Sequence, residues 1–269
     1  MKALPFLDMK RRGAKIAVVT AYDAPTARFE AEAGADIILV GDSVGVNVLG
    51  YRHEREVTLA DMAHHVAAVR RGAPDIYLIA DLPFATYNTP AQALASARTL
   101  RAAGADCVKF EGGASAAAAA ISAAGIDFCG HLGLESQHHD VVRRQGRDAV
   151  SAARIFDDAL ALDAAGQKFL VLELVPRELA ARITKSVGAV VIGIGAGPDT
   201  DGQVLVVNDL AGITRRDFHH NKRYGAVGAA LRDAVRAYVE EVRSGAFPGP
   251  ENAFAMPPEE RVIFERMRP

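Results

Sequence analysis

Eight short apolar runs recur along the chain, and they constrain its fold more than any other feature of the sequence. Each run is rich in β-branched residues and almost continuously apolar, which is typical of strands buried on both faces of a parallel sheet. The runs lie at residues 15–22, 35–43, 77–83, 105–113, 128–134, 168–176, 190–197 and 202–209. They predict eight parallel strands.

Most intervals between these runs have helical patterns. Thr58 and Thr89 stand where helices should begin, and residues 228–243 form a long amphipathic pattern after the last run. The interval at 198–201 is too short for a full helix, so the seventh connection should be irregular. Strands and helices that alternate over roughly 230 residues predict a (β/α)8 barrel, which typically needs about 250. An open doubly wound sheet is the competing architecture, but eight repeats without a second domain favour the barrel.

The chain should therefore form one α/β domain, a TIM barrel. No linker rich in Pro, Gly and Ser divides its 269 residues, and we assign residues 1–269 to a single domain whose core covers about 15–247. Residues 248–269 contain two successive prolines and are predicted to be an irregular, peripheral tail.

Composition narrows the possible partners and the compartment. The formal net charge is −2, so no basic field is available to hold nucleic acid or an anionic membrane. The charged residues 1–13 do not resemble a secretion signal, and the longest uncharged stretch, 112–126, is too short to span a bilayer. Cys107 and Cys129 cannot form a disulfide framework and fit a reducing compartment. We therefore expect a soluble, cytoplasmic protein.

The chemistry should lie at the carboxyl ends of the strands, where barrels of this kind carry their functional residues. The charged and polar residues at those ends are Asp42, Ser43, Asp81, Lys109, Glu111, His131 and Glu173. A charge in an apolar strand is costly unless it is paired or bound. A divalent cation would be a shared partner for Asp42, Asp81 and Glu111, and oxygen ligands favour Mg²⁺ over Zn²⁺. Any one of these acids could instead cap the following helix, an explanation that fits the set less well.

Glu173 stands apart from the other acids. The residues that flank it, 171–172 and 174–175, are apolar, and desolvation makes a carboxylate a better base near neutral pH. A simple pair with a lysine is the alternative. Lys109 points to the same side of its strand as Glu111, where it could hold a substrate carboxylate or pair with Glu111.

Several longer motifs occur in a recognisable order and spacing. They are TAYDAPTARFEAEAGAD at 20–36, GDSVG at 41–45, AVRRGAP at 68–74, ADLPF at 80–84, KFEGG at 109–113, CGHLGL at 129–134 and IGIGAG at 192–197. These motifs resemble those of the ketopantoate hydroxymethyltransferase (3-methyl-2-oxobutanoate hydroxymethyltransferase) family. The resemblance extends from about residue 15 to residue 254.

The resemblance implies a Mg²⁺-dependent (β/α)8 barrel that uses 5,10-methylenetetrahydrofolate as co-substrate. It implies transfer of a hydroxymethyl group to 3-methyl-2-oxobutanoate, giving 2-dehydropantoate in pantothenate and coenzyme A biosynthesis. The metal would stabilise the enolate of the oxo acid. The resemblance also suggests a homo-oligomer, a decamer built as a pentamer of dimers.

Carried over residue by residue, the resemblance assigns roles to the strand-end side chains. Asp42 and Asp81 become metal and substrate ligands, and Glu111 becomes the third acid of the metal site. Glu173 becomes the catalytic base that removes the C3 proton. The remaining substrate contacts would be Ser43, Lys109 and His131.

Two segments depart from the family pattern. Residues 135–147 are shorter than their family counterpart and lack its Thr-Pro, and residues 215–224 replace a Gly-rich segment that contains Pro-Lys-Phe. Both are basic and should lie near the mouth of the barrel, so they could alter folate or substrate preference; neutral surface drift is the alternative. The residues that could hold the glutamyl tail of folate are Arg143, Arg144, Arg215, Arg216 and Lys222.

Two other functions remain open. A carbon–carbon lyase or aldol-type transferase on another 2-oxo acid would use the same metal–enolate chemistry without folate. A catalytically silent paralogue could serve as a binding or assembly subunit, but it would have no reason to keep four costly carboxylates. The glycines at 193–197 do not form a dinucleotide loop, because Pro198 interrupts the required pattern.

Overall fold

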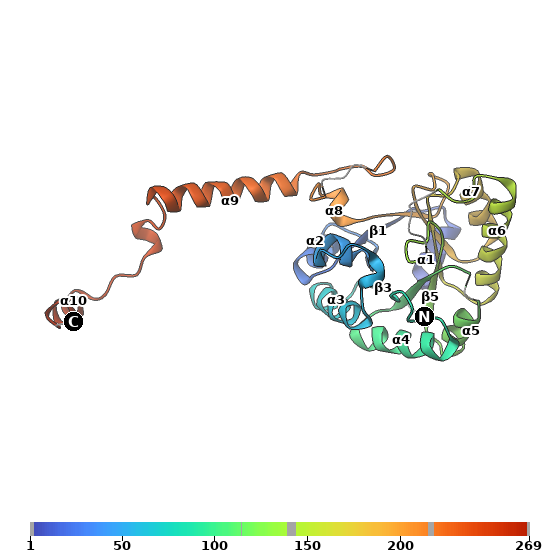
Figure 1. Ribbon diagram of the computed structural model, residues 1–269, viewed down its shortest axis with the longest axis horizontal. Helices are drawn as coiled ribbons and strands as arrows, with labels where there is room; N and C mark the ends of the chain where they lie inside the picture. The colour runs from blue at the N-terminus through green and yellow to red at the C-terminus, as the bar shows by residue number, and fades with distance from the viewer. Residues whose placement is uncertain (1–2, 114, 139–143, 215–217, 268–269) are drawn as a thin grey trace.

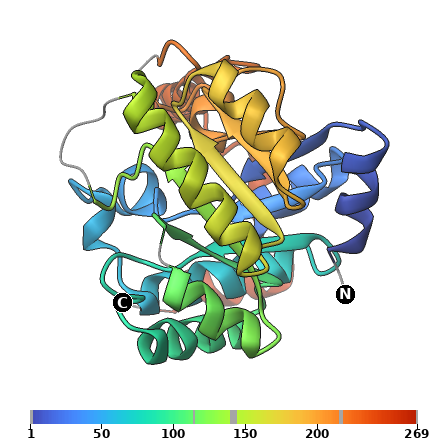
Figure 2. The same ribbon diagram turned by 90° about the vertical axis from the view of Figure 1, so that its right-hand side faces the viewer.

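Eight parallel strands close into a barrel in the computed structural model, which describes residues 3–113, 115–138, 144–214 and 218–267. The strands follow one another around the barrel in chain order, β8 pairs with β1, and helices surround them (Figures 1 and 2). They are β1 (Ile16–Thr20), β2 (Ile37–Val40), β3 (Tyr77–Asp81), β4 (Cys107–Glu111), β5 (Asp127–Gly133), β6 (Phe169–Glu173), β7 (Val190–Ile194) and β8 (Gly202–Leu205). Each coincides with a predicted apolar run, so the (β/α)8 barrel is confirmed.

The connecting helices begin where the sequence places capping residues. Asp23, Thr58 and Thr89 each accept a hydrogen bond from a backbone N–H in the first helical turn. The helices are α2 (Ala24–Glu32), α3 (Leu59–Gly72), α4 (Pro90–Ala103), α5 (Ser115–Ala123), α6 (Ala149–Ala164) and α7 (Arg177–Ser186). A π-helical turn, η1 (Gly45–Leu49), and a 3₁₀ turn, η2 (Glu54–Glu56), lie between β2 and α3. Residues 195–201 are all described and contain no helix, as their short interval predicts.

Two apolar layers stabilise the barrel. Inward-facing side chains such as Leu39, Ile79 and Ile192 fill its interior, and outward-facing ones such as Ile38 and Leu78 pack beneath the helices. Each such side chain contributes about 1.5–3 kcal/mol when it is fully buried. The thiols of Cys107 and Cys129 are buried in the inner layer, and burial raises the pKa of both.

A short N-terminal helix that the sequence did not predict, α1 (Leu4–Arg11), closes the amino-terminal end of the barrel. The Phe6 ring lies 5.2 Å from that of Tyr77 and 5.7 Å from that of Phe169, measured between centroids. These two residues begin β3 and β6, so Phe6 plugs the bottom of the inner layer. The Lys10 ammonium anchors the helix by donating to two backbone carbonyls and one carboxylate near β7 and β8.

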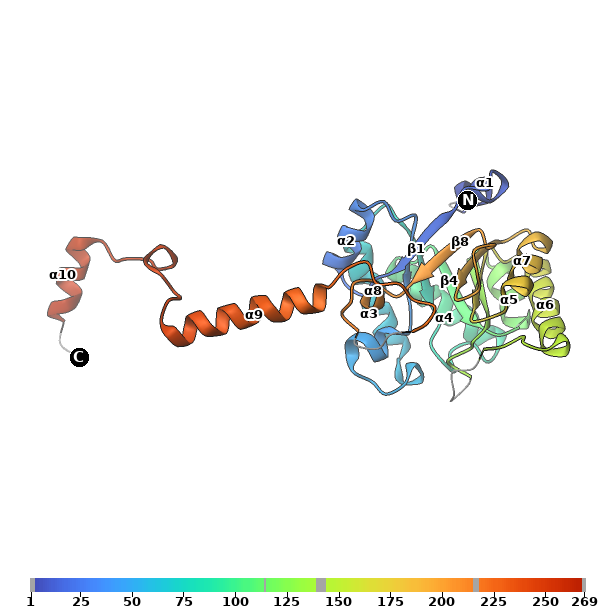
Figure 3. The same ribbon diagram turned by 90° about the horizontal axis from the view of Figure 1, so that it is seen from above.

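The last part of the chain leaves the barrel. The helix after β8, α8 (Val207–Leu210), has four residues, and the long helix α9 (Val227–Ser244) projects away from the barrel (Figures 1 and 3). The sequence predicts a helix here and places it within a core that extends to about residue 247. In the structure, α9 has no buried residue, so the packed barrel ends before it.

The predicted tail is not wholly irregular. Residues 248–267 include a 3₁₀ turn, η3 (Pro250–Asn252), and a helix, α10 (Pro258–Arg266). The successive prolines allow a helix here because they stand at its start, where a proline removes no helical hydrogen bond. In the described part of the chain, no helix combines the length and apolar character that a membrane crossing requires.

Candidate active site

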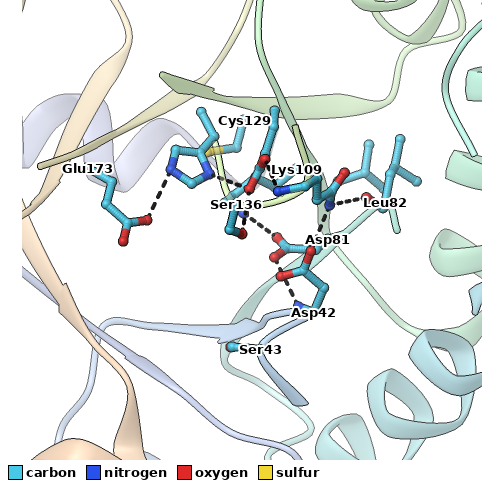
Figure 4. A network of polar contacts seen from close by, with 12 residues as sticks. Asp42, Ser43, Asp81, Leu82, Lys109, Cys129, Ser136 and Glu173 are labelled. Carbon is cyan, nitrogen blue, oxygen red and sulfur yellow. Dashed lines mark hydrogen bonds and ion pairs between the residues drawn. The ribbon is translucent and has the colours of Figure 1, made fainter. Parts of the chain in front are cut away.

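The polar side chains at the carboxyl ends of β2 to β6 gather at one mouth of the barrel (Figure 4). Five of them are buried, with 6% or less of each residue exposed: Asp42, Asp81, Lys109, Glu111 and His131. Glu173 ends β6, and its side chain is 22% exposed. The structure therefore places the predicted strand-end residues, Ser43 included, around one site.

Asp81 and Lys109 form a buried ion pair. They are partners in the register between β3 and β4, and the Lys109 Nζ donates to the Asp81 Oδ1 at 2.7 Å. The backbone N–H of Asp42 donates to the other oxygen of Asp81 at 3.1 Å. Burial by itself would lower the pKa of Lys109, but the surrounding carboxylates, Asp81 foremost, raise it above its usual range. Lys109 is therefore a permanently charged group at this site.

Gln137 connects two of the acids and was not predicted. Its side-chain amide donates to the Asp42 Oδ2 at 2.7 Å, and its backbone N–H donates to the Glu111 Oε2 at 2.8 Å. The hydroxyl of Tyr87 donates to the Gln137 Oε1 at 2.5 Å. Gln137 is 1% exposed and follows the end of β5, so this part of the divergent segment 135–147 belongs to the site.

Ser43 lies beside a second unpredicted residue, Tyr22. The two hydroxyl oxygens are 2.8 Å apart, and the Thr20 hydroxyl donates to the Tyr22 oxygen at 3.1 Å. Burial raises the pKa of Tyr22 to about 12, so its hydroxyl stays protonated and can orient Ser43. A Cβ atom at Gly41 would lie 2.9 Å from the Ser43 Oγ, so a larger residue there would displace this hydroxyl.

The buried charges at the mouth do not balance. Asp42, Asp81 and Glu111 can carry three negative charges against the single positive charge of Lys109. Burial, together with Asp81, raises the pKa of Asp42 to about 7, and burial together with Asp42 raises that of Glu111 well above its usual range. A bound cation would relieve this excess, and carboxylate oxygens are ligands that suit Mg²⁺.

The carboxylates are not arranged around a common point. Among the described residues, no three Asp, Glu, His or Cys side chains form a ligand set for a metal ion. Oxygens of Asp42 and Glu111 instead accept hydrogen bonds from Gln137. The donor chemistry therefore fits Mg²⁺, whereas a common ligand geometry would need these side chains to move.

His131 lies between the acid cluster and Glu173. Its Nε2 is 3.2 Å from the Glu173 Oε2, and its Nδ1 is 3.5 Å from the Glu111 Oε1. Neither ring nitrogen makes a well-directed hydrogen bond in the described structure. Burial lowers the pKa of His131, and the charge of Lys109 lowers it further. A neutral imidazole is therefore the favoured form beside Glu173.

The backbone after Glu173 turns sharply. Leu174 has a φ of 51°, a left-handed conformation that is uncommon for a leucine and tends to occur at functional sites. The Leu174 N–H donates to the carbonyl of Ile194 on β7 at 2.9 Å, and the Glu173 carbonyl accepts from the Leu134 N–H at 2.9 Å. These contacts hold the backbone of Glu173 in place at the rim.

The basic residues of the two divergent segments lie at different positions. Arg144 lines a cavity beside the mouth. The Lys222 ammonium lies 4.7 Å from the centre of the Tyr224 ring and does not line that cavity. The other three, Arg143, Arg215 and Arg216, lie outside the described residues.

Comparison with known families accounts for this combination of barrel and strand-end residues. The sequence pattern of the ketopantoate hydroxymethyltransferase family matches residues 1–250. The chain belongs to this family. It is therefore a transferase enzyme.

Relatives in the ketopantoate hydroxymethyltransferase family cover nearly the whole chain. The 3-methyl-2-oxobutanoate hydroxymethyltransferase of Acidithiobacillus ferrooxidans is 51% identical over 92% of this chain and 97% of its own. The 3-methyl-2-oxobutanoate hydroxymethyltransferase 2 of Hahella chejuensis is 46% identical over 92% of this chain and 96% of its own.

Solved structures of lower sequence identity share the barrel. Phosphonopyruvate hydrolase in complex with oxalate and Mg²⁺ superposes with a TM-score of 0.62 at 13% identity, covering 98% of this chain and 97% of its own. For 2,3-dimethylmalate lyase the TM-score is 0.58 at 17% identity, with the same two coverages. At these identities the likeness concerns the fold alone.

Proposed function

We propose that the chain transfers a hydroxymethyl group from 5,10-methylenetetrahydrofolate to 3-methyl-2-oxobutanoate, giving 2-dehydropantoate for pantothenate and coenzyme A biosynthesis. The names of relatives that are 46% and 51% identical support this substrate. The observation that carries the proposal is the group of three buried carboxylates at the carboxyl ends of β2 to β4, which outnumber the one buried ammonium. Glu173 lies at the rim of the same mouth, in contact with His131. Such an arrangement suits the removal of a proton next to a polarised carbonyl.

Asp42, Asp81 and Glu111 are the residues that would hold Mg²⁺. When bound, a divalent cation supplies Lewis-acid polarisation of the keto group of the oxo acid. The unbalanced negative charge of the three acids supports a cation here. Asp81 would then be shared between the cation and Lys109.

The remaining side chains bind the substrate and move its proton. Lys109 and Ser43 would bind the substrate carboxylate, because an ammonium and a hydroxyl can both donate hydrogen bonds to carboxylate oxygens. Glu173 would take the proton from C3. His131 contacts the carboxylate of Glu173 and would orient it. The electron pair left at C3 would then bond the methylene carbon delivered by folate. The two bonds from that carbon to folate nitrogens would break, water would supply the hydroxyl oxygen, and tetrahydrofolate would leave carrying the proton taken from C3 and one from water.

Product formation tests this proposal. With Mg²⁺, 3-methyl-2-oxobutanoate and folate carrying a ¹³C-labelled methylene group, mass spectrometry should detect labelled 2-dehydropantoate. Omission of folate should abolish the product. An aldol product formed without folate would favour the lyase interpretation, and no product from folded protein would contradict the proposal.

We also propose that the enzyme is a homo-oligomer, in which α9 of one copy packs on the barrel of another. Outward-facing residues of β2 to β7 are buried, whereas Ala17 on β1 and Gln203 on β8 are exposed. The side chains of α9 that would cover them are Val227, Leu231, Val235, Tyr238 and Val242, all exposed. The decamer suggested by the family is one assembly of this kind. A cytoplasmic location is supported by the two free, buried cysteines.

A further inference from the structure

A cavity of about 560 Å³ opens beside Glu173, at the carboxyl ends of β6 and β7. Residues 174–176, which directly follow Glu173, and residues 218–220 line it. A Cβ atom at Gly195 would lie 2.6 Å from the Leu174 side chain and 3.2 Å from that of His220, so the two segments meet closely there. The volume is within the usual range of about 300–1,000 Å³ for small-molecule sites.

The charge of this cavity is opposite to that of the acid cluster. Arg144 and Arg147 line it, and none of the acidic residues that the structure describes does. Neither guanidinium forms an ion pair with a carboxylate of the described residues. Burial lowers the pKa of His220, the nearby Glu173 opposes this shift, and Arg144 adds to it. The cavity is therefore cationic and close to the proposed base.

Apart from His219 and His220, the remaining lining is apolar and includes an aromatic ring. Pro176 and the ring of Phe218, which is 39% exposed, offer flat surfaces for an aryl group. Two guanidiniums can each form charge-assisted hydrogen bonds with one carboxylate. A ligand that combines an aromatic ring with two carboxylates would satisfy both features.

We propose that this cavity binds the aryl-glutamate tail of the reduced folate, with Arg144 and Arg147 pairing with its carboxylates and Phe218 contacting its ring. The inference rests on the proposed function, because that function supplies the folate. The reactive end of the folate would then lie toward Glu173 and the oxo acid. The two substrates would enter oppositely charged halves of one mouth.

Binding of p-aminobenzoyl-L-glutamate to the full chain tests this proposal. Calorimetry should show binding that weakens as salt rises, because the pairs are partly screened. The double variant Arg144→Ala/Arg147→Ala should lose at least about tenfold in affinity, because it removes both charge-assisted pairs. Arg98→Ala, an exposed arginine on α4, is the matched control and should keep the parent affinity.

Equal affinity of the parent chain and the double variant, with both melting at the same temperature, would overturn the proposal. Binding of inorganic phosphate without p-aminobenzoyl-L-glutamate would also overturn it, because the cavity would then be a general anion site. Exchange of the C3 proton of 3-methyl-2-oxobutanoate by the parent chain needs no folate. Failure of that exchange would therefore count against the proposed function and not against the tail site.

Discussion

At the scale of single residues, Asp42 and Asp81 are neighbouring carboxylates with different partners. Asp81→Ala would leave the buried Lys109 ammonium unpaired, and breaking a buried pair costs about 3–5 kcal/mol. Asp42→Asn keeps the shape and relieves repulsion, so it should leave the fold at least as stable. Both variants should lose Mg²⁺-dependent binding of the oxo acid, measured by calorimetry, with stability measured by urea unfolding.

Asp75→Asn, at an exposed position before β3, is the control for removal of one charge. This variant should change neither the Mg²⁺-dependent binding of the oxo acid nor the stability in urea. If Asp42→Asn binds the oxo acid with the same Mg²⁺ dependence as the parent chain, Asp42 does not belong to a metal site.

Glu30 on α2 gives the fold a pH dependence of its own. It is 8% exposed, and neither carboxylate oxygen has a hydrogen-bond partner in the described structure. Burial, together with Asp23, raises its pKa from 4.5 to about 8. The folded chain thus binds this proton more tightly than the unfolded chain, so stability falls as the pH rises from about 4.5 to 8.

Glu30→Gln removes this titration. The variant should melt above the parent chain at pH 8 and at the same temperature at pH 4.5. Each kcal/mol corresponds to about 2–4 °C for a domain of this size. Glu32→Gln, exposed on the same helix, should show no such difference. A temperature gap that is equal at both pH values would show that the effect is not electrostatic.

The sequence shows some site residues and conceals others. The strand-end acids, Lys109 and His131 could be predicted because a polar residue at the end of an apolar strand needs a partner. Gln137 is uncharged and lies in a segment that departs from the family pattern, so no local signal marks it. Tyr22 follows β1, and the pairing of β1 with β2 places its hydroxyl beside Ser43.

At the scale of elements, α1 provides a plug that no strand or helix of the ring replaces. Phe6→Ala should destabilise the fold by about 3–5 kcal/mol, because it leaves a cavity between the rings of Tyr77 and Phe169. Leu4→Ala on the same helix is the control, because Leu4 is 45% exposed. Urea unfolding should separate the two variants by at least about 2 kcal/mol, and equal midpoints would contradict this role for α1.

The ring of strands and helices was predictable because the strands are almost continuous apolar runs and most segments between them have a helical pattern, in places with a capping residue such as Thr58 or Thr89. Helix α1 was not, because its eight residues include only a short apolar patch among charges. The turns η1 and η2 have no distinctive pattern and depend on contacts within the connection between β2 and α3, such as the close approach of Gly45 to the Val57 side chain.

At the scale of the whole molecule, α9 and the uncovered side of the barrel are complementary. The apolar residues of α9 recur at spacings of three or four and form one stripe, while β1 and β8 lack a covering helix (Figure 3). The amphipathic pattern predicts the helix but cannot show whose barrel it covers. Because α9 projects away from its own barrel (Figures 1 and 3), a second copy is the favoured partner.

Light scattering after size-exclusion chromatography tests whether α9 of one copy packs on the barrel of another. The parent chain should form an oligomer, and the double variant Leu231→Asp/Tyr238→Asp should shift toward the monomer at the same concentration. Glu240→Ala, on the opposite side of α9, should leave the mass unchanged. A monomeric parent chain would mean that α9 covers its own barrel or none.

The C3 proton of 3-methyl-2-oxobutanoate provides the most direct measurement of the chemistry at the mouth. In heavy water with Mg²⁺ and without folate, the parent chain should exchange this proton, seen as loss of its NMR signal. Glu173→Gln keeps the shape of the side chain but removes the base, so exchange should fall by about 10²–10⁴-fold while the oxo acid still binds. Exchange by Glu173→Gln at the parent rate would contradict the role of Glu173, and no exchange by the folded parent chain would contradict the enolate chemistry itself.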